Sequence, residues 1–288
     1  MINDSELIIN SDGSIYHLNL LPSDIADTII FVGDPDRVPE VSKYFDNIEI
    51  KKGRREFITH TGSVNGKRIT VISTGIGTDN IDIVLNELDA LVNVDFKTKT
   101  LKPEIKSLDI IRIGTSGSIQ GNISMGTVLA SEYAIGFDTL MQYYKKPYTQ
   151  PEVELQEAVI NHFKGLTFKP YIGRASQKLL DKFAFDLPKG ITMTAPGFYG
   201  PQGRNVRSNN TYPDLIKNAN SFNIEGRNIT NLEMETAGIY ALSNMFGHHA
   251  ISINAILASR VNESFSKNPQ EIVDKAIRMV INRLSHDK

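Results

Sequence analysis

The chain has 288 residues, of which 40% are hydrophobic and 22% are charged, and its formal net charge is -2. These values are ordinary for a globular protein, and the near-neutral charge argues against nucleic acid or an anionic membrane surface as a partner. The chain has no cysteine, which excludes disulfides, thiolate catalysis and cysteine-based metal sites.

The start of the chain and its histidines give further expectations. Residues 1–6 lack a basic region followed by an apolar one, so we expect no signal peptide. No apolar run is long enough to predict a transmembrane helix. The six histidines show no metal-binding spacing, and no metal site is expected. Together with the lack of cysteine, these features are consistent with a cytoplasmic location.

Strands and helices alternate along the chain. Residues 1–14 predict a flexible arm, and the charged stretch 93–107 predicts a solvated insertion. β-branched runs predict strands at 28–32, 48–51, 56–64, 68–73, 109–113, 127–131, 191–194, 229–232 and 250–258. Apolar residues at helical spacing predict helices at 38–45, 79–92, 152–163, 176–183, 212–219, 235–245 and 269–284. This alternation favours one α/β domain over residues 1–288, with a central mixed sheet flanked by helices in three layers.

Four segments rich in glycine follow predicted strands, at 33–37, 75–77, 114–117 and 198–204. Open α/β sheets bind ligands at such turns, where strands end at their carboxyl edge. Arg112 lies inside the apolar run before the third turn, and Thr115 and Ser116 follow it. A buried guanidinium needs an anionic partner, which indicates either an oxyanion site or a pair with a structural carboxylate.

The first turn has the same two interpretations. Gly33 and Arg37 suit a phosphate, but Arg37 also has Asp34 and Asp36 as close partners. Arg55 opens a strand, where its charge also suits an edge that is protected from aggregation.

The loop 198–204 offers Phe198, Gln202 and Arg204. An amide that donates and accepts, beside a guanidinium that only donates, fits the O=C–NH–C=O edge of uracil or thymine. The alternative is a mobile polar loop. Glu233-Met234-Glu235 lies at a strand-to-helix junction, where a carboxylate suits ribose hydroxyls or simply the start of a helix.

These motifs, in this order, resemble the nucleoside phosphorylase-I family from about residue 15 to the end of the chain. The motifs are Gly33-Asp34-Pro35-Asp36-Arg37, Arg55-Glu56-Phe57, Ser73-Thr74-Gly75-Ile76-Gly77, Arg112-Ile113-Gly114-Thr115-Ser116-Gly117 and Glu233-Met234-Glu235. The loop 198–204 is similar to that of the members that cleave uridine. Ser259 stands where purine-cleaving members usually carry aspartate, which counts against purines. The resemblance implies phosphorolysis of uridine, with deoxyuridine or thymidine as further substrates.

The resemblance also implies a role for each site residue. It assigns catalytic roles to Arg112, Glu235 and Arg204. Phosphate would contact Gly33, Arg37, Arg112, Thr115 and, from the neighbouring subunit, Arg55. Ribose would contact Met234, Glu235 and the neighbouring subunit's His17. The base would contact Ser116, Gly117, Phe198, Gln202, Arg204 and Arg260.

Sites shared in this way imply a homo-oligomer that is at least a dimer, and a hexamer is compatible with the family. The expected ligands are a nucleoside and inorganic phosphate as co-substrate, with no cofactor. The residues near Asn80 depart from the family pattern at an interface cation site, so no ion is expected there. Three alternatives remain: a purine nucleoside phosphorylase, a nucleosidase of the same fold, and a non-catalytic nucleoside-binding protein.

Overall fold

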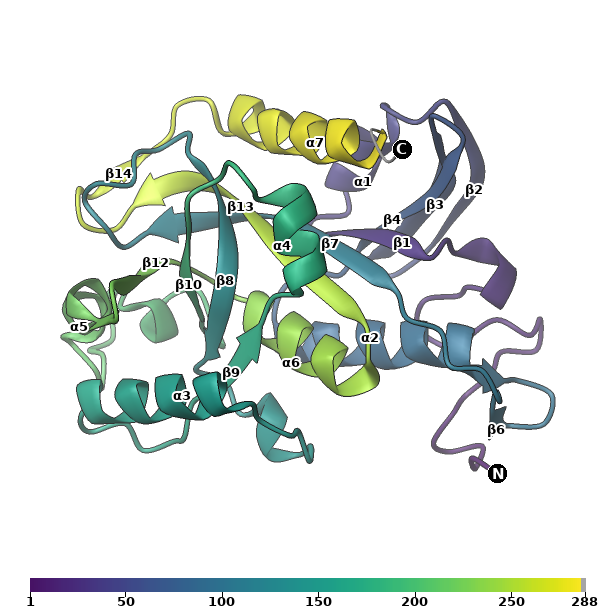
Figure 1. Cartoon of the computed structure of the whole chain (residues 1–288), viewed down its shortest axis with the longest axis horizontal. Helices are drawn as coiled ribbons and strands as arrows, with labels where there is room; N and C mark the ends of the chain where they lie inside the picture. The colour runs from purple at the N-terminus through teal and green to yellow at the C-terminus, as the bar shows by residue number, and fades with distance from the viewer. Residues whose placement is uncertain (286–288) are drawn as a thin grey trace.

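A mixed β-sheet of 12 strands runs through the molecule, and the computed structural model describes residues 1–285 (Figure 1). Its strands are β1 (Thr28–Val32), β2 (Asn47–Arg54), β3 (Phe57–Val64), β4 (Lys67–Ser73), β7 (Asp109–Ser118), β8 (Val128–Gly136), β9 (Tyr171–Arg174), β10 (Lys189–Thr194), β11 (Asn223–Ile224), β12 (Arg227–Glu233), β13 (His249–Ser259) and β14 (Ser264–Phe265). The main path is β11-β12-β10-β8-β13-β7-β1-β4-β3-β2, while β14 pairs with β13 and β9 pairs with β8.

Helices cover both faces of this sheet. They are α1 (Arg37–Ser42), α2 (Thr78–Asn93), α3 (Gln150–His162), α4 (Gln177–Phe183), α5 (Leu215–Ser221), α6 (Thr236–Phe246) and α7 (Pro269–Ser285). In Figure 1, α1 and α7 lie above the sheet, and α2, α3 and α6 lie below it. The expected α/β class, with a mixed sheet between helices, is confirmed. None of the helices described within residues 1–285 has the length and apolar character needed to span a membrane.

Five strands close into a ring. β7 pairs with β13 on one side and, through its last residues, with β12 on the other (Leu232 opposite Gly117). β12, β10, β8 and β13 complete the circle through their own pairings. The ring brings side chains from distant parts of the sequence to one interior, which includes polar residues that are fully buried.

The parallel strands β4, β1 and β7 lie side by side in register. Val32 of β1 is opposite Ser73 of β4, and Phe31 is opposite Arg112 of β7. The carboxyl ends of β1 and β4 therefore place Gly33 and Gly75 at the same edge, beside the middle of β7. This edge carries the candidate site described below.

The strand at 28–32 is confirmed residue for residue, but the expected turn at 114–117 is wrong. β7 continues through Gly114 and Gly117 to Ser118, because Gly114 provides space for a side chain rather than a change of direction. A Cβ on Gly114 would overlap the guanidinium of Arg112, whereas one on Gly117 would make an ordinary contact 3.4 Å from Cγ of Arg260.

Several other predicted bounds need correction. Helix α1 ends at Ser42 instead of Phe45, and α5 begins at Leu215 instead of Tyr212, while β2 and β8 are longer than expected. The short strands β9, β11 and β14 were not predicted. Each of them extends the sheet beside a longer strand, β8, β12 or β13, and each is too short to show a clear alternating pattern.

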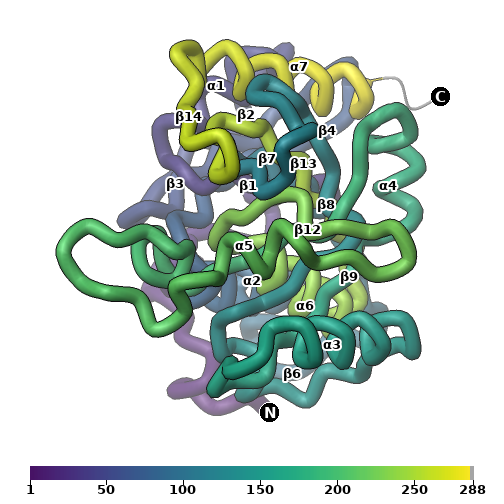
Figure 2. Tube along the Cα trace, turned by 90° about the vertical axis from the view of Figure 1, so that its left-hand side faces the viewer, coloured from purple at the N-terminus to yellow at the C-terminus, as the bar shows by residue number. Residues whose placement is uncertain are grey.

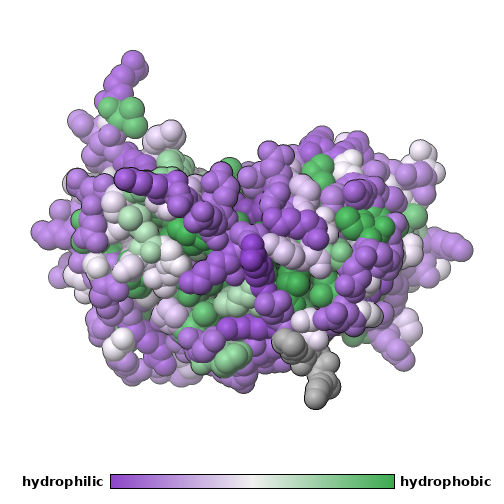
Figure 3. All heavy atoms as spheres, turned by 90° about the horizontal axis from the view of Figure 1, so that it is seen from above, coloured by the Kyte–Doolittle hydropathy of each residue, from purple (hydrophilic) through white to green (hydrophobic). Residues whose placement is uncertain are grey.

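The arm expected to be flexible and the insertion expected to be solvated pack on each other. The segment 93–107 forms a small hairpin of β5 (Val94–Asp95) and β6 (Thr100–Leu101). The N–H of Ile2 donates to the carbonyl of Lys99 at 2.8 Å, and Leu7 is buried. The N-terminal arm is therefore docked along this hairpin. Seen from above, on the side of α7, the surface is mostly hydrophilic, with apolar residues in separate patches (Figure 3).

Candidate active site

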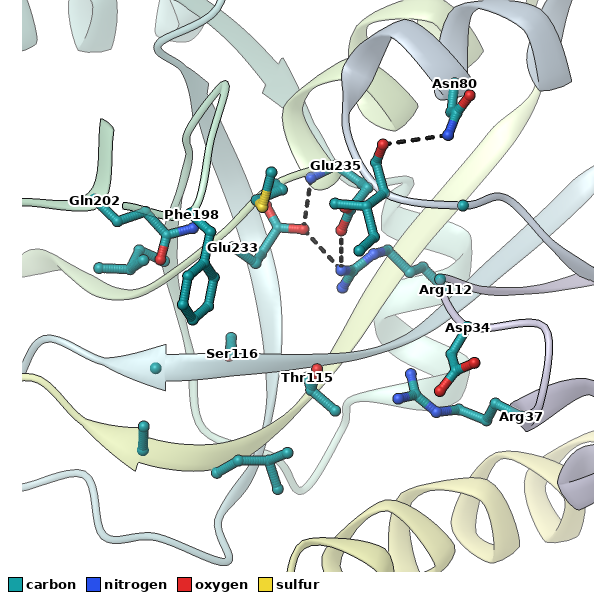
Figure 4. Close-up of a pocket in the computed structure, with 18 of the residues that line it drawn as sticks. Asp34, Arg37, Asn80, Arg112, Thr115, Ser116, Phe198, Gln202, Glu233 and Glu235 are labelled. Carbon is teal, nitrogen blue, oxygen red and sulfur yellow. Dashed lines mark hydrogen bonds and ion pairs between the residues drawn. The ribbon is translucent and has the colours of Figure 1, made fainter. Parts of the chain in front are cut away.

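A pocket of about 850 Å³ opens at the edge where β1 and β4 end. Its size is within the usual range for a small-molecule site. Its lining residues come from eight separate parts of the chain: Gly33, Asp34, Pro35 and Arg37; Glu56; Gly75, Ile76 and Asn80; Arg112, Thr115, Ser116 and Gly117; Phe198, Gln202 and Arg204; Leu232, Glu233, Met234 and Glu235; Leu257 and Ala258; and Phe265. Figure 4 shows Arg37 at one end, Phe198 and Gln202 at the other, and Arg112 between them.

Arg112 is the buried charge at the centre of the pocket. Its Nη2 lies 2.6 Å from Oε2 of Glu235 and 2.9 Å from Oε2 of Glu233. Its Nη1 donates to Asn254 at 3.2 Å and to Ser252 at 3.3 Å. Burial opposes the charge on Arg112, but the two carboxylates outweigh that effect and raise the pKa of the guanidinium. Both interpretations of the sequence thus meet here: Arg112 pairs with carboxylates, and it lines a ligand-sized pocket.

Glu233 is held in place by many donors. Its carboxylate accepts the hydroxyl of Thr194 at 2.6 Å and the N–H groups of Glu235 and Thr236 at 2.9 and 3.0 Å. It therefore satisfies N–H groups at the start of α6, which have no partner inside the helix. Of the two interpretations of this segment, Glu233 matches the acidic residue at the start of a helix.

Glu235 keeps more hydrogen-bonding capacity for a ligand than Glu233, since fewer donors occupy its oxygens. Its Oε1 accepts the N–H of Gly77 at 2.9 Å, and its Oε2 accepts Arg112. Burial raises the pKa of the Glu235 carboxyl, and repulsion from Glu233 adds to that rise, which Arg112 and Gly77 partly offset. A carboxylate held by one cation and one N–H keeps lone pairs available for hydroxyl groups of a ligand.

A second cation lies at the same end of the pocket. Arg37 begins α1, directly after the turn that contains Gly33. Burial lowers the pKa of Arg37, and repulsion from Arg112 adds to this effect, against the attraction of Asp34. Two guanidinium groups in one enclosed region create a site that favours a multivalent anion, and Thr115 adds a hydroxyl to it.

The opposite end of the pocket is built by the loop between β10 and α5, drawn in green and standing out from the body in Figure 2. Cζ of Arg204 lies 3.8 Å from the centre of the Phe198 ring, and its Nη1 donates to the side-chain oxygen of Gln202 at 2.6 Å. Nη1 of Arg260 donates to the backbone carbonyl of Gln202 at 2.9 Å. Burial, together with the charge of Arg260, lowers the pKa of Arg204 to about 10.

Three residues expected at the site do not line this pocket. Arg260 follows β13 directly and contacts the loop through the carbonyl of Gln202. His17 is bound to α2, where its Nδ1 lies 2.6 Å from Oε1 of Glu87. Arg55 lies exposed in the turn between β2 and β3, with a positive φ of 55°. Within residues 1–285 of a single chain, His17 and Arg55 therefore do not reach the pocket.

Some lining residues were not predicted. Ile76 and Phe265 are 66% and 65% exposed and form apolar parts of the rim, while Glu56 and Asn80 converge on Gly75. Glu56 stands next to Arg55 in the motif Arg55-Glu56-Phe57, and this motif is the sequence signal that could have indicated Glu56 as a site residue. Phe265 belongs to the short strand β14, which carries no recognisable sequence signal.

The sequence matches the model of the phosphorylase superfamily over residues 27–285. A uridine phosphorylase of Thermococcus kodakarensis is 31% identical over 258 residues, which are 89% of this chain and 81% of that protein. A purine nucleoside phosphorylase of the DeoD type from Alkaliphilus metalliredigens is 30% identical over 248 residues, which are 85% of this chain and 88% of that protein.

A solved structure is similar over nearly the whole chain. It is the crystal structure of a Trypanosoma brucei nucleoside phosphorylase that is described as showing uridine phosphorylase activity. The two folds agree with a TM-score of 0.87 and 30% sequence identity, over 96% of this chain and 99% of that one. The likeness thus includes the ring of strands and the elements that surround the pocket.

Proposed function

The chain belongs to the phosphorylase superfamily, and from that premise we propose that it cleaves uridine with inorganic phosphate to give uracil and ribose 1-phosphate. The observation that carries the proposal is the pairing of Gln202 and Arg204 beside the exposed ring of Phe198, at the end of the pocket opposite Arg37. Donors and an acceptor placed together suit the imide edge of uracil, and the aromatic ring suits its face.

Phosphate takes the cationic end in this proposal. Arg37 and Arg112 hold its oxygens, together with the hydroxyl of Thr115 and the N–H of Gly33. The phosphate oxygen attacks C1′ of the ribose as the bond between C1′ and N1 breaks, and the bonding electrons leave with the base. Holding both reactants in one pocket removes the entropic cost of bringing them together.

Positive charge develops on the sugar as the base departs. In this proposal phosphate and the carboxylate of Glu235 stabilise this charge, and Glu235 and Met234 hold the ribose. The departing uracil carries the negative charge, which Arg204 and Gln202 stabilise at its imide edge before a proton restores neutral uracil. The proposed steps use side chains and phosphate, with no cofactor.

The decisive experiment follows the absorbance of uridine with and without phosphate, with inosine as a parallel substrate. Phosphate-dependent release of uracil with little cleavage of inosine supports the proposal. Cleavage without phosphate identifies a nucleosidase, and binding without turnover identifies a nucleoside-binding protein.

A purine nucleoside phosphorylase is the second candidate, because a relative with that name is 30% identical. Against it stands Ser259, which is buried and whose Oγ accepts the N–H of Asn262. A serine at this position offers no acid to protonate a purine ring. Preferential cleavage of inosine would favour this candidate.

We also propose that a second copy of the chain completes the site, as at least a dimer. His17 and Arg55 lie outside the pocket of their own chain, which is compatible with a role at a neighbouring pocket. Sedimentation at several protein concentrations tests this, and a monomer with full activity would refute it. The hexamer and the cytoplasmic location stay predictions.

A further inference from the structure

A chain of buried hydrogen-bonding side chains crosses the interior of the strand ring, from Arg112 to Ser116. Its five links join successive strands of the ring: Arg112 Nη1 to Asn254 Oδ1 at 3.2 Å, Asn254 Nδ2 to Ser131 Oγ at 2.9 Å, Ser131 Oγ to Thr192 Oγ1 at 2.5 Å, Thr192 Oγ1 to Asn231 Oδ1 at 2.9 Å, and Asn231 Nδ2 to Ser116 Oγ at 3.0 Å. The four internal residues have no exposed surface. Both ends of the chain reach the pocket.

Arg112 is the first residue in this chain of side chains, and it determines which atom donates in each of the hydrogen bonds that follow. A guanidinium has donors only and keeps its charge, so Asn254 must turn its oxygen toward Arg112 and its NH₂ toward Ser131. Ser131 therefore accepts from Asn254. Either hydroxyl of the Ser131–Thr192 pair could donate, but Thr192 is the acceptor left for the buried hydrogen of Ser131 among the hydrogen bonds of residues 1–285, so that hydrogen goes to Thr192. Thr192 in turn uses its hydrogen on the oxygen of Asn231.

Asn231 connects this series of hydrogen bonds to Ser116, which lines the pocket. The Asn231 oxygen accepts the hydroxyl of Thr192, and the hydroxyl of Thr230 lies 2.9 Å from it and 3.2 Å from the carbonyl of Ile191, between which its one hydrogen is shared. The NH₂ of Asn231 therefore faces Ser116 and donates to that hydroxyl oxygen. Ser116 cannot return its hydrogen to Asn231, and no acceptor for it lies among the hydrogen bonds of residues 1–285. The hydrogen of Ser116 is left for a ligand.

We propose that Asn231 is a positioning residue that makes Ser116 a hydrogen-bond donor to the bound nucleoside. Ser116 lies between Thr115 and Phe198 in Figure 4, so its partner is an oxygen that flanks the glycosidic bond: O2 of uracil or the ring oxygen of ribose. This inference rests on the proposed function, because it needs a nucleoside in the pocket. Arg112, which is expected to hold phosphate, thus also determines that Ser116 donates its hydrogen bond to the nucleoside.

The test begins with Asn231→Asp, which keeps the size of the side chain but removes its donor. A carboxylate accepts the Ser116 hydrogen, so lone pairs instead of a donor face the nucleoside. We expect kcat/KM for uridine to fall about tenfold, with less than a twofold change in KM for phosphate. Adding Ser116→Ala to this variant should cost little more, because the two changes remove the same contact.

Two further variants keep the proposal testable if a buried carboxylate prevents folding. Thr192→Val breaks the chain without touching the pocket and leaves Thr230 as the one hydroxyl beside the Asn231 oxygen, so the amide is held less firmly and kcat/KM for uridine should fall about threefold. Thr61→Val is the matched control: Thr61 is also fully buried and bonds to Thr70 and to the carbonyl of Asp24, far from the site. It should lower stability without changing kcat/KM.

Sulfur analogues identify the acceptor. The penalty of Ser116→Ala should disappear with 2-thiouridine if O2 is the partner, and with 4′-thiouridine if the ring oxygen is. A penalty that persists with both analogues, or equal kinetic effects of Thr192→Val and Thr61→Val, would overturn the inference. A wild-type protein without uridine cleavage would overturn the proposed function instead, so the two failures are distinct.

Discussion

Gly114 provides the space in which the guanidinium of Arg112 lies, and this gives a sharp prediction. A Cβ at position 114 would overlap Nη1 and Cζ of Arg112 and lie 2.7 Å from Nη2, inside the 3.4 Å at which ordinary contact begins. The backbone of Gly114 lies in a strand without a positive φ, so alanine fits the main chain. Gly114→Ala therefore perturbs Arg112 and little else.

The magnitude follows from the contacts that Arg112 loses when it moves. Its Nη2 lies 2.6 and 2.9 Å from two buried carboxylates, and losing this geometry costs about 3 kcal/mol of unfolding free energy. The lower entropy of the unfolded chain with alanine returns up to about 1 kcal/mol, which leaves a net loss of about 2 kcal/mol. Because the displaced arginine no longer faces phosphate, we expect kcat/KM for phosphate to fall about 100-fold.

Urea denaturation and steady-state kinetics with varied phosphate measure both effects. Gly121→Ala is the control, because no atom lies within 4 Å of the position that its added methyl group would take, and its φ is not positive. It should change neither quantity by more than about 0.5 kcal/mol. A Gly114→Ala protein with the stability and phosphate kinetics of the wild type would refute the reasoning about Arg112.

Three further predictions concern other charged groups. Arg204→Ala should raise KM for uridine about tenfold and leave KM for phosphate unchanged in steady-state assays, because it removes the cation beside Phe198 and Gln202; unaltered uridine kinetics would remove the argument for a base site. Since the pKa of Glu235 is raised, its carboxylate takes up a proton at a higher pH than an exposed glutamate, so kcat should fall as the pH decreases through that raised value; a Glu235→Gln variant that keeps the same acid limb in its pH profile would contradict this. Lys146→Met leaves the buried carboxylate of Glu152 without its partner at 2.7 Å, and denaturation should show a loss of about 3–5 kcal/mol with kcat unchanged below the transition; an unchanged midpoint would show that the pair contributes nothing.

The sequence predicted the elements whose residues follow a regular pattern. The strand at 28–32 has four consecutive apolar residues after Thr28, and α2 buries Ile81, Val84, Leu85, Leu88 and Leu91 at helical spacing. The strand β9 lacks such a pattern, because its four residues obtain their order from pairing with β8. Tertiary pairing of this kind is not encoded in a local run of residues.

The residues of the candidate site could likewise be predicted only in part. Residues that end strands or form motifs, such as Arg112 and Glu235, were expected and lie in the pocket. Glycines were ambiguous, since a glycine that makes room for a guanidinium has the same sequence signal as one that allows a turn. The role of Asn231 depends on partners from four other strands, and no spacing in the sequence indicates it.

The pairing of β7 with β12 also has a consequence for the order in which the protein is made. Arg112 and Glu235 are 123 residues apart in the chain, and the ribosome needs roughly 6 to 25 s to add that many residues. During this interval β7 is synthesised but one of its edges is open and its arginine has no carboxylate from β12 or α6. The nascent chain thus carries an unpaired strand edge of the kind that attracts other chains, until the last third of the protein emerges and closes the ring.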